Sequence, residues 1–204
     1  MRPSKDVTVI GAGVVGLATA VELAERGAKV TLIERSPALG GDAASWLAGG
    51  MLAPYCEGES APPSVVQRGV KAIDWWSRRV PGVAREGTLV VAPPRDVGEI
   101  DRFAALTREY ARVDEAHIAA LEPDLAGRFS RGLFFPGEGY VDPRLAMRAL
   151  RDHLVARAAE IQFGVDGETA KTCGVVIDCR GFAARSDLAE LRGVRGEMMI
   201  VRTR

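Results

Sequence analysis

The first 34 residues of this 204-residue chain place the strongest constraint on its fold. A short β-branched run at Val7–Ile10 is followed directly by the glycine-rich sequence Gly11-Ala12-Gly13-Val14-Val15-Gly16. Apolar residues then recur at helical spacing as far as Gly27, and Lys29–Glu34 has the composition of a second strand. A strand, a glycine turn, a helix and a second strand form a βαβ unit. Because such units belong to parallel, doubly wound sheets, the sequence predicts an α/β fold.

The glycine pattern matches GxGxxGxxxAxxLxxxGxxVxxxE, which ends at Glu34. Gly11 permits a tight strand-to-helix turn, Gly13 lets the backbone approach a pyrophosphate, and Gly16 lets the helix lie close to the sheet. A pyrophosphate would meet the unpaired N–H groups and the positive end of the helix dipole. Glu34 can accept hydrogen bonds from both hydroxyls of a ribose. The pattern therefore predicts a dinucleotide site, with FAD and NAD as alternatives.

The rest of the chain shows two kinds of pattern. The expected elements are a loop at residues 36–63, a helix at 65–80, a strand at 88–92, a helix at 96–111, a short strand at 133–135, a helix from the Asp142 cap to about 159, a strand at 161–163 and a buried strand at 174–178. The βαβ rhythm is absent from about residue 75 to 140 and returns at 142. We therefore expect a nucleotide domain that is interrupted by a second, substrate-facing domain.

Composition excludes several other classes of protein. Lys and Arg total 27, as do Asp and Glu, so the zero net charge gives no electrostatic argument for a nucleic-acid or membrane partner. The three cysteines and two histidines lack ligand spacing, and we expect neither a disulfide framework nor a metal site. An apolar run at residues 7–20 has features of a secretory leader, but three glycines interrupt it. We expect a soluble, cytoplasmic protein.

A second glycine-rich segment, Gly40–Pro54, contains the run Ala48-Gly49-Gly50-Met51-Leu52-Ala53-Pro54. Small residues at this density let the backbone pass close to a flat ligand. Together with the fingerprint, Gly139–Pro143 and Gly193–Met198, this run resembles the FAD-dependent D-amino-acid oxidase superfamily, and most closely its glycine oxidase branch, which feeds thiamin thiazole synthesis. The resemblance covers the whole chain and implies FAD rather than NAD.

The resemblance also implies roles for particular residues. Val14 and Val15 would donate hydrogen bonds to the pyrophosphate, and Glu34 and Arg35 would hold the adenosine ribose. Ala44 and Ser45 would line the phosphate and ribityl region. The expected cofactor-binding residues are Gly11, Gly13, Val14, Val15, Gly16, Glu34, Arg35, Ala44, Ser45, Gly49, Gly50 and Met51, the last three against the isoalloxazine ring, and Val165 at the adenine.

The implied architecture is a Rossmann-like FAD-binding domain of the glutathione reductase type, interrupted by an α+β substrate domain. The expected division is FAD-binding at 1–75 and 142–190, substrate domain at 76–141, and the start of a further substrate-domain segment at 191–204. Members of the resembled family continue well beyond a position like Arg204. That further part supplies an arginine for the substrate carboxylate, a nearby tyrosine and a glycine-rich segment over the flavin. We therefore expect no catalytic residue and no activity in residues 1–204 alone.

The reaction implied by the resemblance is hydride transfer from the α-carbon of a small amino acid to the flavin. Glycine is the expected substrate, oxygen the electron acceptor, and the imine and hydrogen peroxide the products. A D-amino-acid or sarcosine oxidase or dehydrogenase, and a non-catalytic FAD-binding fragment, remain as alternatives. A homo-oligomer is possible, and neither a nucleic acid nor a membrane is expected as a partner.

Overall fold

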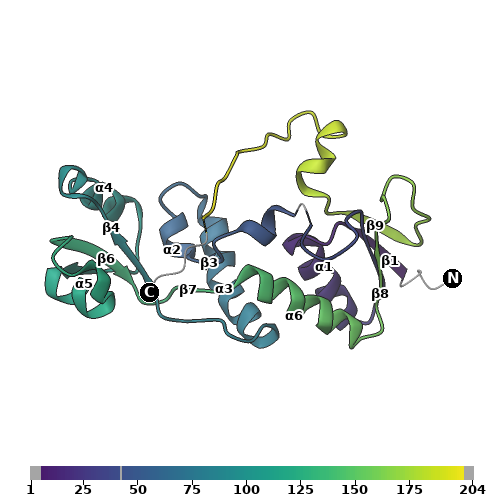
Figure 1. Ribbon diagram of the computed structural model, residues 1–204, viewed down its shortest axis with the longest axis horizontal. Helices are drawn as coiled ribbons and strands as arrows, with labels where there is room; N and C mark the ends of the chain where they lie inside the picture. Colours follow the sequence, from purple (N-terminus) through teal and green to yellow (C-terminus); the bar gives the residue numbers. More distant parts are fainter. Residues whose placement is uncertain (1–5, 42, 200–204) are drawn as a thin grey trace. The chain divides into compact units, whose positions relative to one another are not determined.

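The computed structural model of this protein describes residues 6–41 and 43–199. Contacts along the chain divide these residues into two compact units. Unit 1 comprises residues 6–41, 43–49, 79–81 and 142–199, and unit 2 comprises residues 50–78 and 82–141. Unit 1 is thus built from both ends of the sequence and unit 2 from its middle, as the colours in Figure 1 show.

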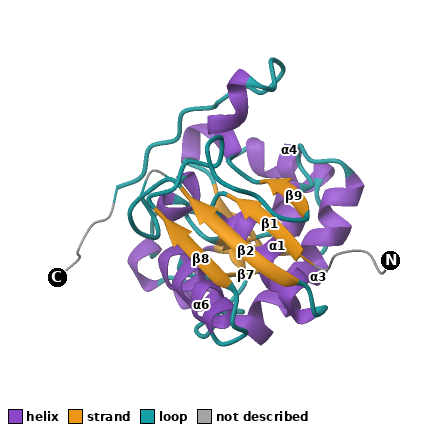
Figure 2. Cartoon of the chain, turned by 90° about the vertical axis from the view of Figure 1, so that its right-hand side faces the viewer, coloured by secondary structure: helices purple, strands orange, loops and turns teal. Residues whose placement is uncertain are grey.

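Unit 1 contains a four-stranded parallel sheet with the strand order β8-β2-β1-β9 (Figure 2). The strands are β1 (Asp6–Ile10), β2 (Lys29–Glu34), β8 (Glu160–Phe163) and β9 (Val175–Asp178). In the register of the sheet, Val9 lies opposite Leu32 on one side and Ile177 on the other. The predicted βαβ opening is present, and the expected α/β class with a parallel sheet is confirmed.

Two helices form the next layer of unit 1: the first packs against β1 and β2, and the second packs against the first (Figure 1). They are α1 (Val14–Glu25) and α6 (Pro143–Val155). On the apolar faces of these helices, Leu17, Leu150 and Leu154 are completely buried. Leu32 of β2 is also completely buried. Because burial of one such side chain contributes about 1.5–3 kcal/mol, these residues form the main core of unit 1.

Local sequence signals set the ends of both helices. Gly27, with a φ of 82°, follows the last turn of α1 in the left-handed conformation that favours glycine. Asp142 caps α6, where its Oδ1 accepts hydrogen bonds from the amides of Arg144 at 2.8 Å and Leu145 at 3.1 Å. Pro143 occupies the first helical position, which needs no N–H donor. The predicted start of this helix is therefore correct.

Unit 2 is built around a three-stranded antiparallel sheet with the order β4-β6-β5. Its strands are β4 (Thr88–Val91), β5 (Ala111–Asp114) and β6 (Arg131–Phe135), and a separate pair joins β3 (Met51–Leu52) to β7 (Gly139–Tyr140). The helices are α2 (Pro54–Glu57), α3 (Pro63–Arg79), α4 (Glu99–Leu106) and α5 (Glu115–Leu121). Ile100, Ala104, Leu133 and Phe135 form its buried cluster.

Short 3-10 turns complete both units. Unit 1 contains η1 (Ala44–Leu47) and η4 (Gly181–Ser186), and unit 2 contains η2 (Pro94–Asp96) and η3 (Pro123–Leu125). The expected loop at 36–63 therefore holds the short elements η1, β3 and α2.

The first boundary between the units lies at residue 49, earlier than the expected boundary at residue 75. The pairing of β3 with β7 joins residues 51–52 to 139–140. The buried Glu138 reinforces this link, because its Oε1 accepts hydrogen bonds from the amides of Tyr55 at 2.7 Å and Cys56 at 2.8 Å. Residues 50–78 consequently group with the middle of the chain, and unit 1 resumes at Asp142.

Three expectations about individual elements were wrong. The helix expected at 96–111 ends at Leu106, because Ala111–Asp114 pairs with β6 as a strand. The strand β9, expected to be buried, leaves Val175 58% exposed because it forms an edge of the sheet. The alternation of arginine with apolar residues at 192–204 predicts a half-buried strand, but residues 192–199 contain no strand, and residues 200–204 lie outside the described residues.

No helix in the described part of the chain has both the length and the apolar character needed to cross a bilayer.

Candidate functional site

A cavity of about 490 Å³ opens in unit 1 at the carboxyl ends of the parallel strands. This edge of an open α/β sheet is where ligands bind in doubly wound folds. The walls come from the ends of β1, β2 and β9, the start of α1, the turn η1 and two later segments. The lining residues are Ile10, Gly11, Gly13, Val14, Val15, Glu34, Arg35, Ser36, Ala43, Ala44, Ser45, Asp166, Gly167, Glu168, Cys179, Arg180, Gly181, Phe182, Ala183 and Arg185.

The three fingerprint glycines differ in why they must be glycine. Gly11 has a φ of 101°, and a Cβ there would lie 2.5 Å from the carbonyl oxygen of Cys179. A Cβ on Gly16 would lie 1.8 Å from the carbonyl oxygen of Gly11. A Cβ on Gly13 would approach only Ser45 Oγ, at 3.6 Å, which is an ordinary contact. Gly11 and Gly16 are thus required by the fold itself, whereas Gly13 keeps space open beside the start of α1.

The start of α1 already has one hydrogen-bond partner in the cavity wall. The Val14 amide donates to Ser45 Oγ at 3.1 Å, and Val15 is 63% exposed. A hydroxyl has one donor and two acceptor positions, so Ser45 can accept from Val14 and still donate to an anion. The Val14 amide, which we expect to contact the pyrophosphate, has the Ser45 hydroxyl as its hydrogen-bond partner in this structure.

The Glu34 carboxylate is held at the end of β2 by two backbone amides. Its Oε2 accepts from Ala12 at 2.7 Å, and its Oε1 accepts from Ser36 at 2.8 Å. Each carboxylate oxygen retains further acceptor capacity after one hydrogen bond. Glu34 therefore presents a fixed acceptor to the cavity, with Arg35 beside it in the same wall.

The turn η1, which carries Ser45, is held against α6 by the contacts of Trp46. The Trp46 ring lies over Gly40, where a Cβ would be 2.6 Å from the indole. The guanidinium carbons of Arg144 and Arg148 lie 5.8 and 5.1 Å from the centroid of the Trp46 ring. Arg144 Nε also donates to the carbonyl oxygen of Trp46 at 3.2 Å. Sequence reasoning missed this support, although arginines four residues apart share one face of a helix.

Arg180 is a second feature that sequence reasoning missed. Its guanidinium lies in the cavity wall and binds the carboxylates of Glu168, Asp178 and Asp187. The hydrogen bonds from Arg180 hold the pKa of the Asp178 carboxyl below its usual value, with burial opposing them. Burial raises the pKa of the neighbouring Cys179 thiol, which favours its uncharged form.

The remaining predicted residues lie elsewhere. Gly16 is buried within α1, and Gly49 is exposed at the end of the first stretch of unit 1. Gly50 and Met51 belong to unit 2, where the Gly50 carbonyl oxygen accepts a hydrogen bond from the Val141 amide at 2.9 Å. The Val165 amide donates to the carbonyl oxygen of Glu34 at 3.1 Å. Of these five residues, Val165 is hydrogen-bonded to a residue that lines the cavity.

These groups suit a dinucleotide. The start of a helix and the Ser45 hydroxyl offer donors for a diphosphate, and the fixed carboxylate of Glu34 offers acceptors for ribose hydroxyls. Within the part of the chain that the structure describes, no group of three or more His, Cys, Asp or Glu side chains is arranged to hold a metal ion. The parallel sheet, the glycine turn and the cavity define a dinucleotide-binding protein of the doubly wound class.

Comparison with known proteins gives the family. The family described as "FAD dependent oxidoreductase" (DAO) matches residues 6–204, and the chain belongs to this family. Its cofactor is accordingly FAD, which confirms the expectation from the sequence. The α/β fold expected for an FAD-dependent oxidoreductase is also confirmed.

Two curated relatives and one solved structure describe the likeness further. The chain is 50% identical over 198 residues to a Rhizobium etli protein named as a thiamine biosynthesis oxidoreductase, ThiO, covering 97% of this chain and 60% of the relative. It is 32% identical over 169 residues to a glycine oxidase of Pseudomonas aeruginosa, covering 74% of this chain and 43% of the relative. The crystal structure of glycine oxidase from Geobacillus kaustophilus matches 88% of this chain and 56% of that one, with 20% identity and a TM-score of 0.71. The chain thus spans between 43% and 60% of the length of these proteins.

Proposed function

We propose that this protein acts in the oxidation of glycine by FAD, and that the product supplies the thiazole part of thiamin. The observation that carries the proposal is the 50% identity, across 97% of the chain, to the relative named as a thiamine biosynthesis oxidoreductase. The likeness to a glycine oxidase points to glycine as the substrate. The cavity of unit 1 supports the flavin part of the proposal, because its fixed donors and acceptors suit a dinucleotide.

The proposed cofactor site is the cavity of unit 1. We place the diphosphate of FAD at the start of α1, where the Ser45 hydroxyl and the Val15 amide would donate to it. We place the adenosine ribose at Glu34 and Arg35, with the adenine towards Val165. Gly13 leaves the backbone accessible, since it places no side chain of its own over the first turn of α1.

Bound FAD would supply the acceptor for the hydride that leaves the α-carbon of the substrate. The residues of this chain would then bind and orient the cofactor. We propose that unit 2 is the substrate-facing domain and that Gly49, Gly50 and Met51 lie against the isoalloxazine ring. No residue of the described chain is assigned a catalytic role.

The test of cofactor binding uses the 204-residue chain. FAD added to the purified protein should give a flavin spectrum that persists through gel filtration, and acid precipitation should release all of the flavin. Flavin that remains on the precipitate would contradict non-covalent binding. Retention of NAD instead of FAD would contradict the cofactor site.

The test of the reaction uses the polypeptide expressed from the complete gene. Anaerobic addition of glycine should bleach the flavin absorbance, and readmission of oxygen should produce hydrogen peroxide. We expect kcat/KM to be higher for glycine than for sarcosine or D-alanine. A preference for D-alanine or sarcosine would replace glycine by the corresponding substrate, and failure of all three to reduce the flavin would overturn the proposed activity.

A further inference from the structure

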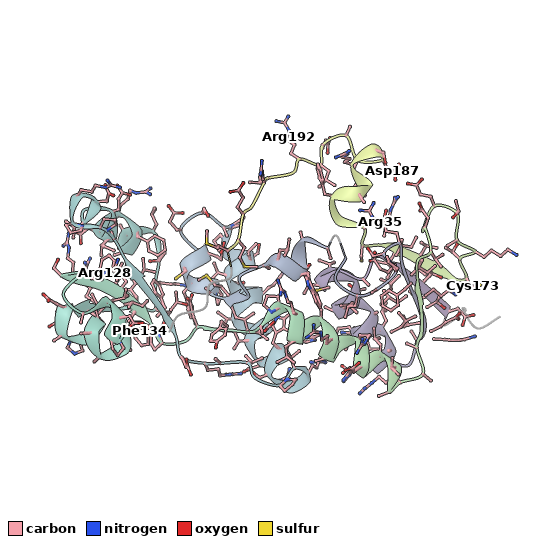
Figure 3. The ribbon with its side chains drawn as sticks, viewed as in Figure 1. Arg35, Arg128, Phe134, Cys173, Asp187 and Arg192 are labelled. Carbon is pink, nitrogen blue, oxygen red and sulfur yellow. The ribbon has the colours of Figure 1, made fainter. Side chains whose placement is uncertain are left out.

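Arg180 joins three segments of unit 1 that are separate in the sequence. Its Nη1 lies 2.8 Å from Glu168 Oε1 in the connection between β8 and β9. Its Nη2 lies 2.8 Å from Asp178 Oδ2 at the end of β9, and 2.5 Å from Asp187 Oδ2 just after η4. Figure 3 labels Asp187 on this last segment. One side chain therefore holds the end of a strand, a loop and a 3-10 turn together.

These contacts form part of the wall of the cavity. Arg180 and Glu168 both line it, and so do Asp166, Gly181 and Phe182 from the same two segments. The Arg180 side chain is only 17% exposed, whereas those of Glu168 and Asp187 are 63% and 57% exposed. The guanidinium thus lies inward, with the carboxylates between it and solvent.

Apolar packing contributes little to this part of the wall. Among the described residues 164–199, Ala184 alone is buried, and the connection at 164–174 contains neither helix nor strand. A segment with few buried apolar contacts opens easily unless other interactions hold it. Hydrogen bonds tie the two ends of the connection to unit 1, from Gly164 and Val165 to the end of β2 and from Cys173 to Thr8 of β1. The ion pairs of Arg180 add links from Glu168, within the connection, and from Asp187 to the end of β9.

The same geometry argues against Arg180 as a phosphate ligand. Three carboxylates already surround a single guanidinium, so the cluster carries an excess of negative charge. A diphosphate would have to displace these carboxylates and would then face their charge at short range. A guanidinium that is satisfied in this way fixes structure and does not recognise an incoming anion.

We propose that Arg180 is a positioning residue that closes the wall of the FAD cavity by binding Glu168 and Asp187. The inference rests on the proposed placement of FAD in unit 1. The closed wall slows release of the cofactor, and opening of the Arg180 contacts is the step that lets FAD leave. Salt weakens ion pairs between partly exposed groups, so release of FAD becomes faster as ionic strength rises.

The experiment measures the rate of FAD release from the 204-residue chain, followed by the recovery of flavin fluorescence after dilution. Arg180→Ala should speed release about tenfold, which corresponds to about 1.4 kcal/mol. Arg180→Lys keeps the charge but loses the planar fork, and should restore part of the slow release. Salt should accelerate release from the parent protein and have little further effect on Arg180→Ala.

The matched controls are Arg151→Ala and Asp152→Asn, which remove the same charges from an ion pair of α6 away from the cavity. Both should release FAD at the parent rate. Circular dichroism checks that each variant is folded, and if Arg180→Ala does not fold, Arg180→Lys and Asp187→Asn carry the test.

The variant Asp187→Asn distinguishes a positioning role of Arg180 from a role as a phosphate ligand. If Arg180 closes the wall, this change speeds release of FAD, because the ion pair between Arg180 and residue 187 is lost. If Arg180 binds phosphate, the change frees the guanidinium and slows release, which would overturn the proposal. Parent-like release from both Arg180→Ala and Asp187→Asn would also overturn it. Failure of the parent chain to bind FAD would instead overturn the cofactor site and the inference that depends on it.

Discussion

Replacement of Glu34 by alanine should weaken both the fold of unit 1 and its hold on FAD. The carboxylate accepts hydrogen bonds from the Ala12 and Ser36 amides at 2.7 and 2.8 Å, so it joins the glycine turn to the end of β2. A hydrogen bond to a charged group contributes about 1.5–3 kcal/mol. Because Glu34 is only half-buried and water can replace part of this interaction, we expect a loss of about 2–4 kcal/mol in the free energy of unfolding.

The effect on binding comes from the acceptors that Glu34 would offer to the ribose. Loss of a partner for hydroxyl groups should weaken FAD binding by a further 1–3 kcal/mol, about 5- to 150-fold in Kd. Urea unfolding followed by circular dichroism gives the first quantity, and titration of flavin fluorescence gives the second. Glu160→Ala is the control, since Glu160 is an exposed residue of β8 outside the cavity. A Glu34→Ala variant with parent stability and parent Kd would refute both steps of the reasoning.

Three further predictions follow from the same unit. Gly16→Ala should destabilise the protein by about 3 kcal/mol, because its Cβ would lie 1.8 Å from the Gly11 carbonyl oxygen; a parent-like melting temperature would contradict this. Trp46→Ala removes the contacts that hold η1 to α6 and should raise the Kd for FAD about tenfold by fluorescence titration, and an unchanged Kd would show that η1 needs no such support. The hydrogen bond from Arg79 lowers the pKa of Glu25 in the folded protein. The ionised Glu25 therefore stabilises the fold fully above the pKa of an unfolded glutamate, and this stabilisation is lost as pH falls through the lowered pKa. The free energy of unfolding should therefore depend less on pH in the acidic range for Arg79→Ala than for the parent, and equal slopes would count against the pair.

The opening of unit 1 could be predicted from sequence because its signals are local. The β-branched run, the glycine turn and the cap at Gly27 each fix a few neighbouring residues, and β1, α1 and β2 lie where these signals place them. The same holds for the start of α6, which Asp142 and Pro143 determine. In these places local preference and tertiary structure agree.

Elements that depend on distant partners were harder to predict. The segment Ala111–Asp114 continues a helical pattern in the sequence, but its backbone pairs with β6. Residues 50–57 follow directly on the first stretch of unit 1, yet β7 and Glu138 join them to unit 2. The partners lie about twenty positions away for β5 and more than eighty positions away for residues 50–57, and no local pattern contains such pairing.

The candidate site was predicted in part. The residues around the glycine turn and Glu34 follow a spaced pattern with a physical reason for each position, and the structure brings them to one cavity. The roles of Trp46 and Arg180 depend on side chains that meet only in the fold. A turn such as Cys179-Arg180-Gly181 gives no sign in the sequence that its arginine binds Glu168 and Asp187.

The central claim is that the cavity of unit 1 holds FAD, and a crystal structure of the protein grown with FAD tests it most directly. We predict density for the diphosphate at the start of α1, within hydrogen-bond distance of Ser45 Oγ, and for the ribose hydroxyls at the Glu34 carboxylate. The wall formed by Arg180 should remain closed beside it. Density for FAD elsewhere on the protein, with this cavity left empty, would contradict the account.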